Sequence, residues 1–151
     1  MKKIKFHKAI NMALEYSLKR DKSLILYGLG VSDPKEIFET TINLQKKFGS
    51  QRVFDTPNSE NALTGMGIGY GMMGGRAVMT HQRLDFSLLS LDQLINNAAK
   101  LFYTSDGKFS VPITIRLIVG RGWGQGPNHS QALQSLYAHI PGLKVVSPSN
   151  P

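Results

Sequence analysis

The chain has 151 residues, of which 41% are hydrophobic, and it contains no cysteine. This length suits a single domain with a substantial core, and the lack of cysteine excludes a disulfide scaffold and a thiolate metal site. No apolar run approaches the roughly 20 residues of a membrane span, and the basic N-terminus does not lead into an apolar signal region, so we expect a cytoplasmic protein.

The positive charge is concentrated in the N-terminal third of the chain. The net charge is +8, and residues 1–52 hold 11 basic and 5 acidic side chains. Such an excess can attract an acidic partner or nucleic acid. Here most of the basic residues surround one predicted helix, as on a solvated face, and they do not interleave with aromatic residues as a base-stacking platform requires. We therefore expect no nucleic-acid partner.

The first third of the chain alternates helix and strand patterns. Apolar residues at helical spacing over residues 6–18 predict an amphipathic helix that ends near Arg20. Residues 24–27 (LILY) predict a short buried strand. Asp33 and Pro34 can begin a helix, and residues 41–48 favour a further helix that Gly49 is placed to end.

A glycine-rich helix follows the next predicted strand, residues 53–55 (VFD). Ser59 is a good N-cap, so Glu60 lies on the first turn of a helix over residues 60–73. Its glycines at 65, 67, 69 and 71 each cost about 1 kcal/mol relative to alanine. Small residues permit close packing of another backbone, so we expect this helix to be buried, at a subunit contact, and to end at Gly74.

Strand and helix patterns continue in the second half. Residues 77–80 (AVMT) predict a strand, and Asp85 is placed to cap a helix that runs to residue 102. Residues 112–119 (PITIRLIV) form the most strand-like run. A loop with four glycines, residues 120–129, precedes a helix over residues 133–140, and residues 143–146 (LKVV) predict a last strand.

This alternation is typical of an α/β fold, a Rossmann-like parallel sheet with helices on both faces, here as a single domain over residues 1–151. The carboxyl ends of parallel strands meet at one edge, where such folds bind ligands. Glu60, Phe86 and His129 are expected there. Taken singly, each has a structural explanation, because Glu60 can complement a helix dipole, Phe86 can belong to the core and His129 can cap a helix or lie in a loop.

Several kinds of site are excluded by missing motifs. The chain has no G-x-G-x-x-G directly after a strand and no Walker loop. Its four histidines lack zinc spacing and no acidic cluster resembles a magnesium site, so no metal site is expected. Residue counts do not exclude a Ser-His-Asp triad, but no G-x-S-x-G elbow is present. Trp123 in the glycine-rich loop can be a lid, an interface anchor or a partly buried side chain.

Several separate motifs together resemble one family. They read DTPNSE at residues 55–60, TGMGIG at 64–69, DFSLL at 85–89, DQ at 92–93, NAAK at 97–100, HSQ at 129–131 and AHIPGLKVV at 138–146. In register from about residue 5 onward, the chain is similar to the beta subunits of 2-oxo-acid dehydrogenase decarboxylating components, of the pyruvate and branched-chain types. These subunits are relatives of transketolase.

The resemblance implies the pyrimidine-binding domain of a thiamine-diphosphate enzyme. Glu60 would hold the ring nitrogen of the aminopyrimidine and favour the imino tautomer, which takes the proton from the thiazolium carbon. Phe86 would pack on the pyrimidine. His129 would assist the intermediates or acyl transfer to a lipoyl arm. The chain would then belong to an oxidoreductase that decarboxylates a 2-oxo acid.

The resemblance also implies partners. The chain lacks the family's magnesium-diphosphate motif, Gly-Asp-Gly followed by Asn. An alpha-type subunit would therefore hold the diphosphate and Mg²⁺, and a second beta copy and a lipoyl acyltransferase are further expected partners. An isolated chain would be inactive because half of its cofactor site lies elsewhere. We also expect a truncated C-terminus, since family members continue into a further domain.

Two departures from the family pattern leave alternatives open. Leu29 lies in a loop where the family commonly has an acid, and residues 80–84 (THQRL) replace the usual EFMTF, as in a less-studied bacterial branch that shares residues 122–127 (GWGQGP). His81, Gln82 and Arg83 can contact a substrate carboxylate or form salt bridges in an interface. The alternatives are a catalytically inactive, truncated relative that acts as an assembly or regulatory module, and another transketolase-like enzyme subunit.

Overall fold

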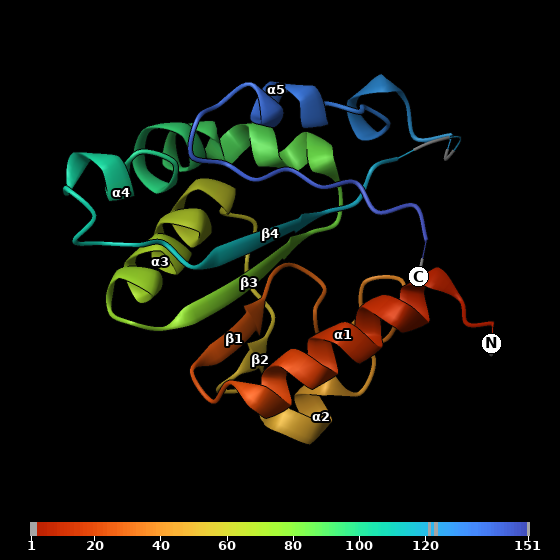
Figure 1. Cartoon of the computed structure of the whole chain (residues 1–151). Coiled ribbons are helices and arrows are strands. Elements are labelled where there is room, and N and C mark those ends of the chain that lie inside the picture. The colour runs from red at the N-terminus through yellow and green to blue at the C-terminus, as the bar shows by residue number, and fades with distance from the viewer. Residues whose placement is uncertain (1–2, 121, 123, 151) are drawn as a thin grey trace.

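Four parallel strands form the centre of the molecule (Figure 1). The computed structural model describes residues 3–120, 122 and 124–150. Met79 of one central strand pairs with Tyr27 on one side and with Ile115 on the other. The strands are β1 (Leu24–Tyr27), β2 (Val53–Phe54), β3 (Arg76–His81) and β4 (Ile113–Leu117), in the order β2-β1-β3-β4.

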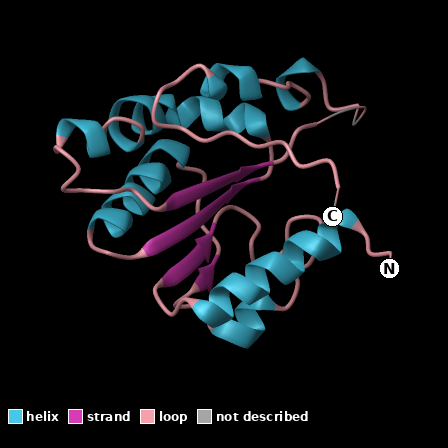
Figure 2. Cartoon of the chain, viewed as in Figure 1, coloured by secondary structure: helices cyan, strands magenta, loops and turns pink. Residues whose placement is uncertain are grey.

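Helices cover both faces of this sheet, as the sequence predicted (Figures 1 and 2). On one face, α1 (Phe6–Arg20) and α2 (Leu44–Phe48) bury Leu18 and Leu44 against Leu26 of β1. On the other face, α3 (Glu60–Met72) packs on a second cluster around Tyr27, Ala77 and Met79. The remaining helical segments are η1 (Leu84–Ser90), η2 (Gln93–Ala98), α4 (Leu101–Thr104), η3 (Pro127–His129) and α5 (Gln134–Ala138).

Most predicted elements lie close to their expected limits. Helix α1 and strand β1 match residues 6–20 and 24–27, and α3 begins at Glu60. Ser59 holds the N-cap position of α3, although its side chain makes no capping hydrogen bond within the described chain. Gly49 ends α2 with a positive φ of 84°, a conformation that glycine adopts without steric cost.

The helix predicted to begin at Asp33 is wrong. Residues 36–39 have positive φ angles between 41° and 65°, so the chain makes left-handed turns there. The Thr41 hydroxyl donates to the carbonyl oxygens of Val31 and Glu36, both at 2.8 Å. These bonds satisfy carbonyl groups outside a helix, which explains why two threonines support this turn. Helix α2 consequently begins only at Leu44.

Two predictions in the second half of the chain, the helix over residues 85–102 and the strand over residues 143–146, also need correction. The helix over residues 85–102 is irregular, with a 3₁₀ segment (η1), a π segment (η2) and the short α4, and Asp85 lies inside its first turn instead of capping it. Residues 143–146 form no strand, and Val146 is 83% exposed. Gly142 lies so close to the Ala99 carbonyl that a Cβ would collide with it, which holds the following chain beside the helical layer.

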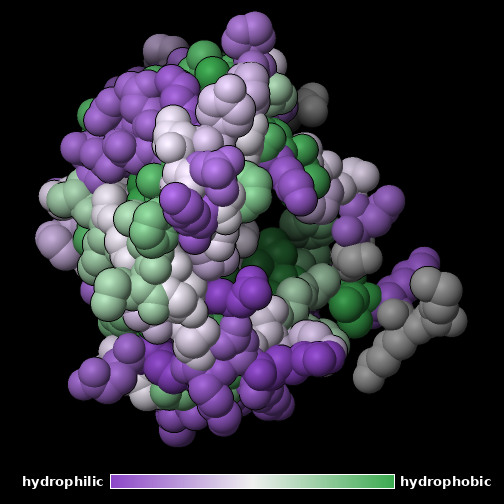
Figure 3. All heavy atoms as spheres, turned by 60° about the vertical axis from the view of Figure 1, so that its left-hand side comes forward, coloured by the Kyte–Doolittle hydropathy of each residue, from purple (hydrophilic) through white to green (hydrophobic). Residues whose placement is uncertain are grey.

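A groove of about 390 Å³ lies between α1 and the amino ends of β3 and β4. It opens on the face of the molecule that Figure 3 shows hollowed. Arg76 and Asp21 line it and form an ion pair at 3.1 Å, so these two charges already have partners. The carboxyl ends of the strands, where the predicted site residues meet, lie at the opposite edge of the sheet.

Candidate functional site

The loops at the carboxyl edge of the sheet are tied to one another. The Asp55 carboxylate, just after β2, accepts hydrogen bonds from the backbone N–H groups of Gly30 (2.8 Å) and Thr56 (2.7 Å). Gly28 follows β1 with a φ of 146°, and a Cβ there would collide with the Thr80 carbonyl of β3. Only glycine therefore lets this loop cross so close to the neighbouring strand.

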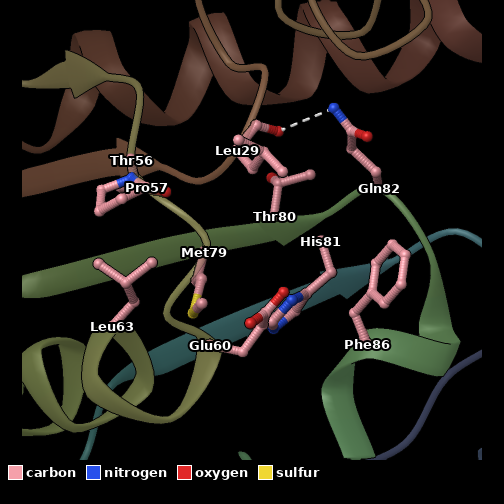
Figure 4. A pocket seen from close by; sticks show the side chains of 10 residues that line it. All are labelled: Leu29, Thr56, Pro57, Glu60, Leu63, Met79, Thr80, His81, Gln82 and Phe86. Atoms are coloured by element: carbon pink, nitrogen blue, oxygen red, sulfur yellow. Dashed lines mark hydrogen bonds between the residues drawn. The ribbon is translucent and has the colours of Figure 1, made fainter. Parts of the chain in front are cut away.

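A pocket, partly open to solvent, lies at this edge (Figure 4). Half-buried Glu60 rises from the first turn of α3 toward β3, and His81 points from the end of β3 into the same space. The Phe86 ring stands beside them. The other lining residues are mostly apolar: Leu29, Thr56, Pro57, Leu63, Met79, Thr80 and Gln82.

The glycine-rich loop brings His129 to this pocket through Phe86. The two rings meet edge to face, with their centroids 5.5 Å apart. Asp85 anchors this contact, because its Oδ1 accepts hydrogen bonds from the backbone N–H (3.2 Å) and the side-chain amide (2.8 Å) of Gln131. Of the residues predicted to meet at one edge, Glu60 and Phe86 line the pocket, whereas His129 contacts the Phe86 ring and is not a lining residue.

The three neighbouring polar residues predicted for a substrate carboxylate have different surroundings. The Gln82 side chain donates to the Leu29 carbonyl at 3.4 Å (Figure 4). Arg83 is 6% exposed, donates to Gln125 at 2.9 Å and lies over the Phe38 ring. Of the three, only His81 and Gln82 line the pocket. Arg83 instead connects the left-handed turn to the glycine-rich loop, and Trp123 of that loop lies outside the described residues.

Electrostatics separates the two ionisable groups of the pocket. His81 is 4% exposed, and burial lowers its pKa from 6.5 to about 4, so its ring is neutral near pH 7. Glu60 lies at the half-buried rim, on the first turn of α3. The pocket therefore pairs one acid with an uncharged imidazole.

The sequence matches a known family over almost its whole length. The family described as "Transketolase, pyrimidine binding domain" matches residues 2–151. The chain belongs to this family. Its resemblance to the beta subunits of 2-oxo-acid dehydrogenases is confirmed by the relatives that it matches.

Three of these relatives show the extent of the similarity. This pyrimidine-binding domain is 38% identical to the 2-oxoisovalerate dehydrogenase subunit beta of Bacillus subtilis and 40% identical to that of Pseudomonas aeruginosa, each over 95% of this chain. It is 39% identical to the human mitochondrial pyruvate dehydrogenase E1 component subunit beta, over 94% of this chain. The matches cover 44%, 41% and 40% of those relatives, so the chain spans less than half of their length.

The sequence analysis missed the residues of this pyrimidine-binding domain that hold the start of α3 against the sheet. The fully buried Tyr27 donates its hydroxyl hydrogen to the Leu63 carbonyl of α3 at 2.8 Å and stacks on Phe54 at 5.6 Å. This bond fixes the first turns of α3, and with them Glu60, over the strand ends. A buried tyrosine at the end of an apolar strand was the available signal, since its hydroxyl needs a partner.

Within residues 3–120, 122 and 124–150, no group of three or more His, Cys, Asp or Glu side chains is placed to hold a metal ion. No helix in that part of the chain is long and apolar enough to cross a membrane.

Proposed function

We propose that this chain is the pyrimidine-binding, beta-type part of a thiamine-diphosphate-dependent 2-oxo-acid dehydrogenase of the pyruvate or branched-chain type. The observation that carries this proposal is the position of Glu60, half-buried on the first turn of α3 and facing a pocket with Phe86. The family match and the names of the relatives support it. The cytoplasmic location stays a prediction.

The residues of the pocket fit an aminopyrimidine ring. Leu63, Met79 and Phe86 offer apolar contacts to a flat ring, and the Glu60 carboxylate offers an acceptor for a protonated ring nitrogen. Bound thiamine diphosphate supplies an electron sink for decarboxylation of a 2-oxo acid. With the cofactor bound, Glu60 would hold a proton at the ring nitrogen, and the Phe86 ring would contact the pyrimidine. His129, at the edge of Phe86, is the candidate for proton exchange with the substrate.

The assembly is part of the proposal. The sequence lacks the family's magnesium-diphosphate motif, so an alpha-type subunit holds the diphosphate and Mg²⁺. A second beta copy and a lipoyl acyltransferase complete the set of partners that the resemblance implies. Among the described residues, Met66 on α3 and Met73 just after it are exposed and available for such a contact.

Calorimetric titration with thiamine diphosphate and Mg²⁺ tests the divided site. We expect no tight binding by the isolated chain and tight binding once an alpha-type partner is added, because the diphosphate carries most of the charge that is recognised. Tight binding by the isolated chain would contradict the divided site. No binding with the partner present would favour the alternative of an inactive assembly module, which the Leu29 side chain at the pocket supports.

Replacement of Glu60 by glutamine tests the acid. In the assembled complex, Glu60→Gln removes the proton exchange while the side chain keeps its shape, so turnover of the 2-oxo acid should fall at least about 100-fold. The control is Glu39→Gln, which removes an exposed carboxylate that pairs with His7 at 3.2 Å, far along the chain from the pocket. Near-normal turnover by the Glu60 variant, with assembly intact, would remove Glu60 from the proposed role.

A further inference from the structure

His81 is an unusual side chain for the floor of an apolar pocket. It is the last residue of β3, and strand alternation turns it to the same side as Met79, toward α3 (Figure 4). It is 4% exposed and lines the pocket together with Leu63 and Phe86. A phenylalanine would fill this position without any polar atom, so the imidazole needs its own explanation.

The Nε2 atom of His81 is buried and has no hydrogen-bond partner among the described residues. Buried polar atoms are nearly always paired, because an unpaired one forfeits its hydrogen bonds to water without replacement. No ion pair joins His81 to Glu60, although both side chains face the pocket. The unpaired Nε2 atom therefore suggests that a group from outside the chain binds in the pocket and forms the missing hydrogen bond.

The charge state of His81 limits what that group can be. Burial holds the pKa of the ring near 4, so at neutral pH the ring presents one N–H donor and one acceptor and no positive charge. A neutral imidazole forms a weaker hydrogen bond to a carboxylate than an imidazolium does, because it lacks the positive charge. Glu60 is the only other ionisable side chain among the described residues that line the pocket.

We propose that His81 is a second ligand-binding residue of this pocket, whose Nε2 forms a hydrogen bond with an uncharged polar atom of the aminopyrimidine ring that Glu60 binds. This inference rests on the proposed function and adds a specificity contact on the β3 side of the ring. It also assigns His81 to the heterocycle and away from a substrate carboxylate.

Two variants separate the hydrogen bond from the shape of the side chain. His81→Phe keeps a flat ring and removes both nitrogen atoms, whereas His81→Gln keeps a neutral donor and acceptor. Binding of thiamine diphosphate with Mg²⁺ is measured by calorimetry on the assembled complex of each variant. We expect His81→Phe to weaken binding about tenfold and His81→Gln to stay within about threefold of the parent protein. Equal binding by the parent and His81→Phe would overturn the proposal.

Nitrogen NMR of the parent protein gives a second readout that needs no variant and no turnover. The Nε2 resonance of His81 should shift when thiamine diphosphate and Mg²⁺ are added to the complex, and should not shift further with pyruvate. An unchanged resonance on cofactor addition, or a shift only with pyruvate, contradicts the proposed contact. If the parent complex does not bind the cofactor, the proposed function and this inference both fail; if it binds and His81 does not respond, the inference alone fails.

Discussion

His81 and Glu60 show how two titratable residues at one pocket differ in their burial. Glu60 lies at the half-buried rim on a helix N-terminus, whereas His81 lies 4% exposed among apolar side chains. Burial without a charged partner penalises the imidazolium and leaves a neutral ring. The same burial that keeps His81 neutral links its protonation to the stability of the whole domain.

Acid should therefore destabilise the chain through His81. The folded-state pKa of about 4 lies below the unfolded value of 6.5, so the unfolded chain binds the proton first as the pH falls. The contribution of the neutral His81 to the free energy of unfolding is fully present above about pH 6.5. It declines by about 3 kcal/mol as the pH falls to 4. Urea unfolding of the chain at several pH values between 8 and 4 measures this decline.

A variant comparison isolates the histidine from the other acid-sensitive groups. His81→Phe cannot take up a proton, so its stability should fall less steeply than that of the parent chain between pH 6.5 and 4. His139→Phe, at an exposed site, should keep the parent slope. Identical slopes for His81→Phe and the parent chain would show that His81 already has an ordinary pKa in the folded state.

Helix α3 explains at the level of the element why so many glycines occur in one helix. A Cβ at Gly67 would collide with the Tyr27 hydroxyl and the Ile113 side chain, and a Cβ at Gly71 would press on Pro112. Gly69 has open space, with no described atom within 4 Å of an added Cβ. Gly67 and Gly71 therefore let the helix lie close to the sheet, whereas Gly69 has no close neighbour among the described residues.

Alanine substitutions at Gly67 and Gly69 should consequently have opposite effects. Gly67→Ala forces the Tyr27 hydroxyl away from the Leu63 carbonyl and should destabilise the chain by about 1–3 kcal/mol. Gly69→Ala gains helix propensity at an open site and should stabilise the chain by up to about 1 kcal/mol. Thermal and urea unfolding of the isolated chain measure both changes, and equal effects at the two sites would contradict the close packing of α3.

Elements that follow from local pattern were predictable, and elements that depend on distant contacts were not. The helical spacing of residues 6–18 and the parallel alternation were enough to bring Glu60, Phe86 and His129 to one edge. The left-handed turn at residues 36–39 depends on the hydroxyl bond from Thr41 to Val31, and the path after Gly142 depends on Ala99. The spacing of residues in the sequence does not predict contacts between such distant residues.

Only part of the pocket was predictable from the sequence. Its acid and its aromatic ring stand in motifs that the sequence displays, whereas the anchoring of the histidine loop by Asp85 and Gln131 becomes visible only when the two segments meet. The unpaired Nε2 of His81 is likewise a property of its burial. Residue identity indicates which groups can act, and packing decides which of them has an open hydrogen-bonding atom.

At the scale of the molecule, the chain presents one helix face that its own packing does not use. Met66 of α3 and Met73, the residue that follows the helix, are 41% and 87% exposed, with the open Gly69 between them in the sequence. Large apolar side chains gathered on one face are typical of a surface that another chain covers. The proposed assembly with an alpha-type subunit and a second beta copy requires such a surface beside the half-site that carries Glu60.

A charged substitution on this surface should weaken the assembly without changing the stability of the isolated chain. Met73→Asp puts a carboxylate into the proposed contact, so the complex should dissociate at least about tenfold more readily, because burying an unpaired charge is costly. The isolated chain should unfold within about 0.5 kcal/mol of the parent, since the site is solvated there. Met12→Asp on α1, at a methionine that is 51% exposed, provides the matched control and should leave assembly unchanged. Sedimentation velocity over a concentration series measures dissociation, and equal dissociation of the two variants would place the contact elsewhere than on α3.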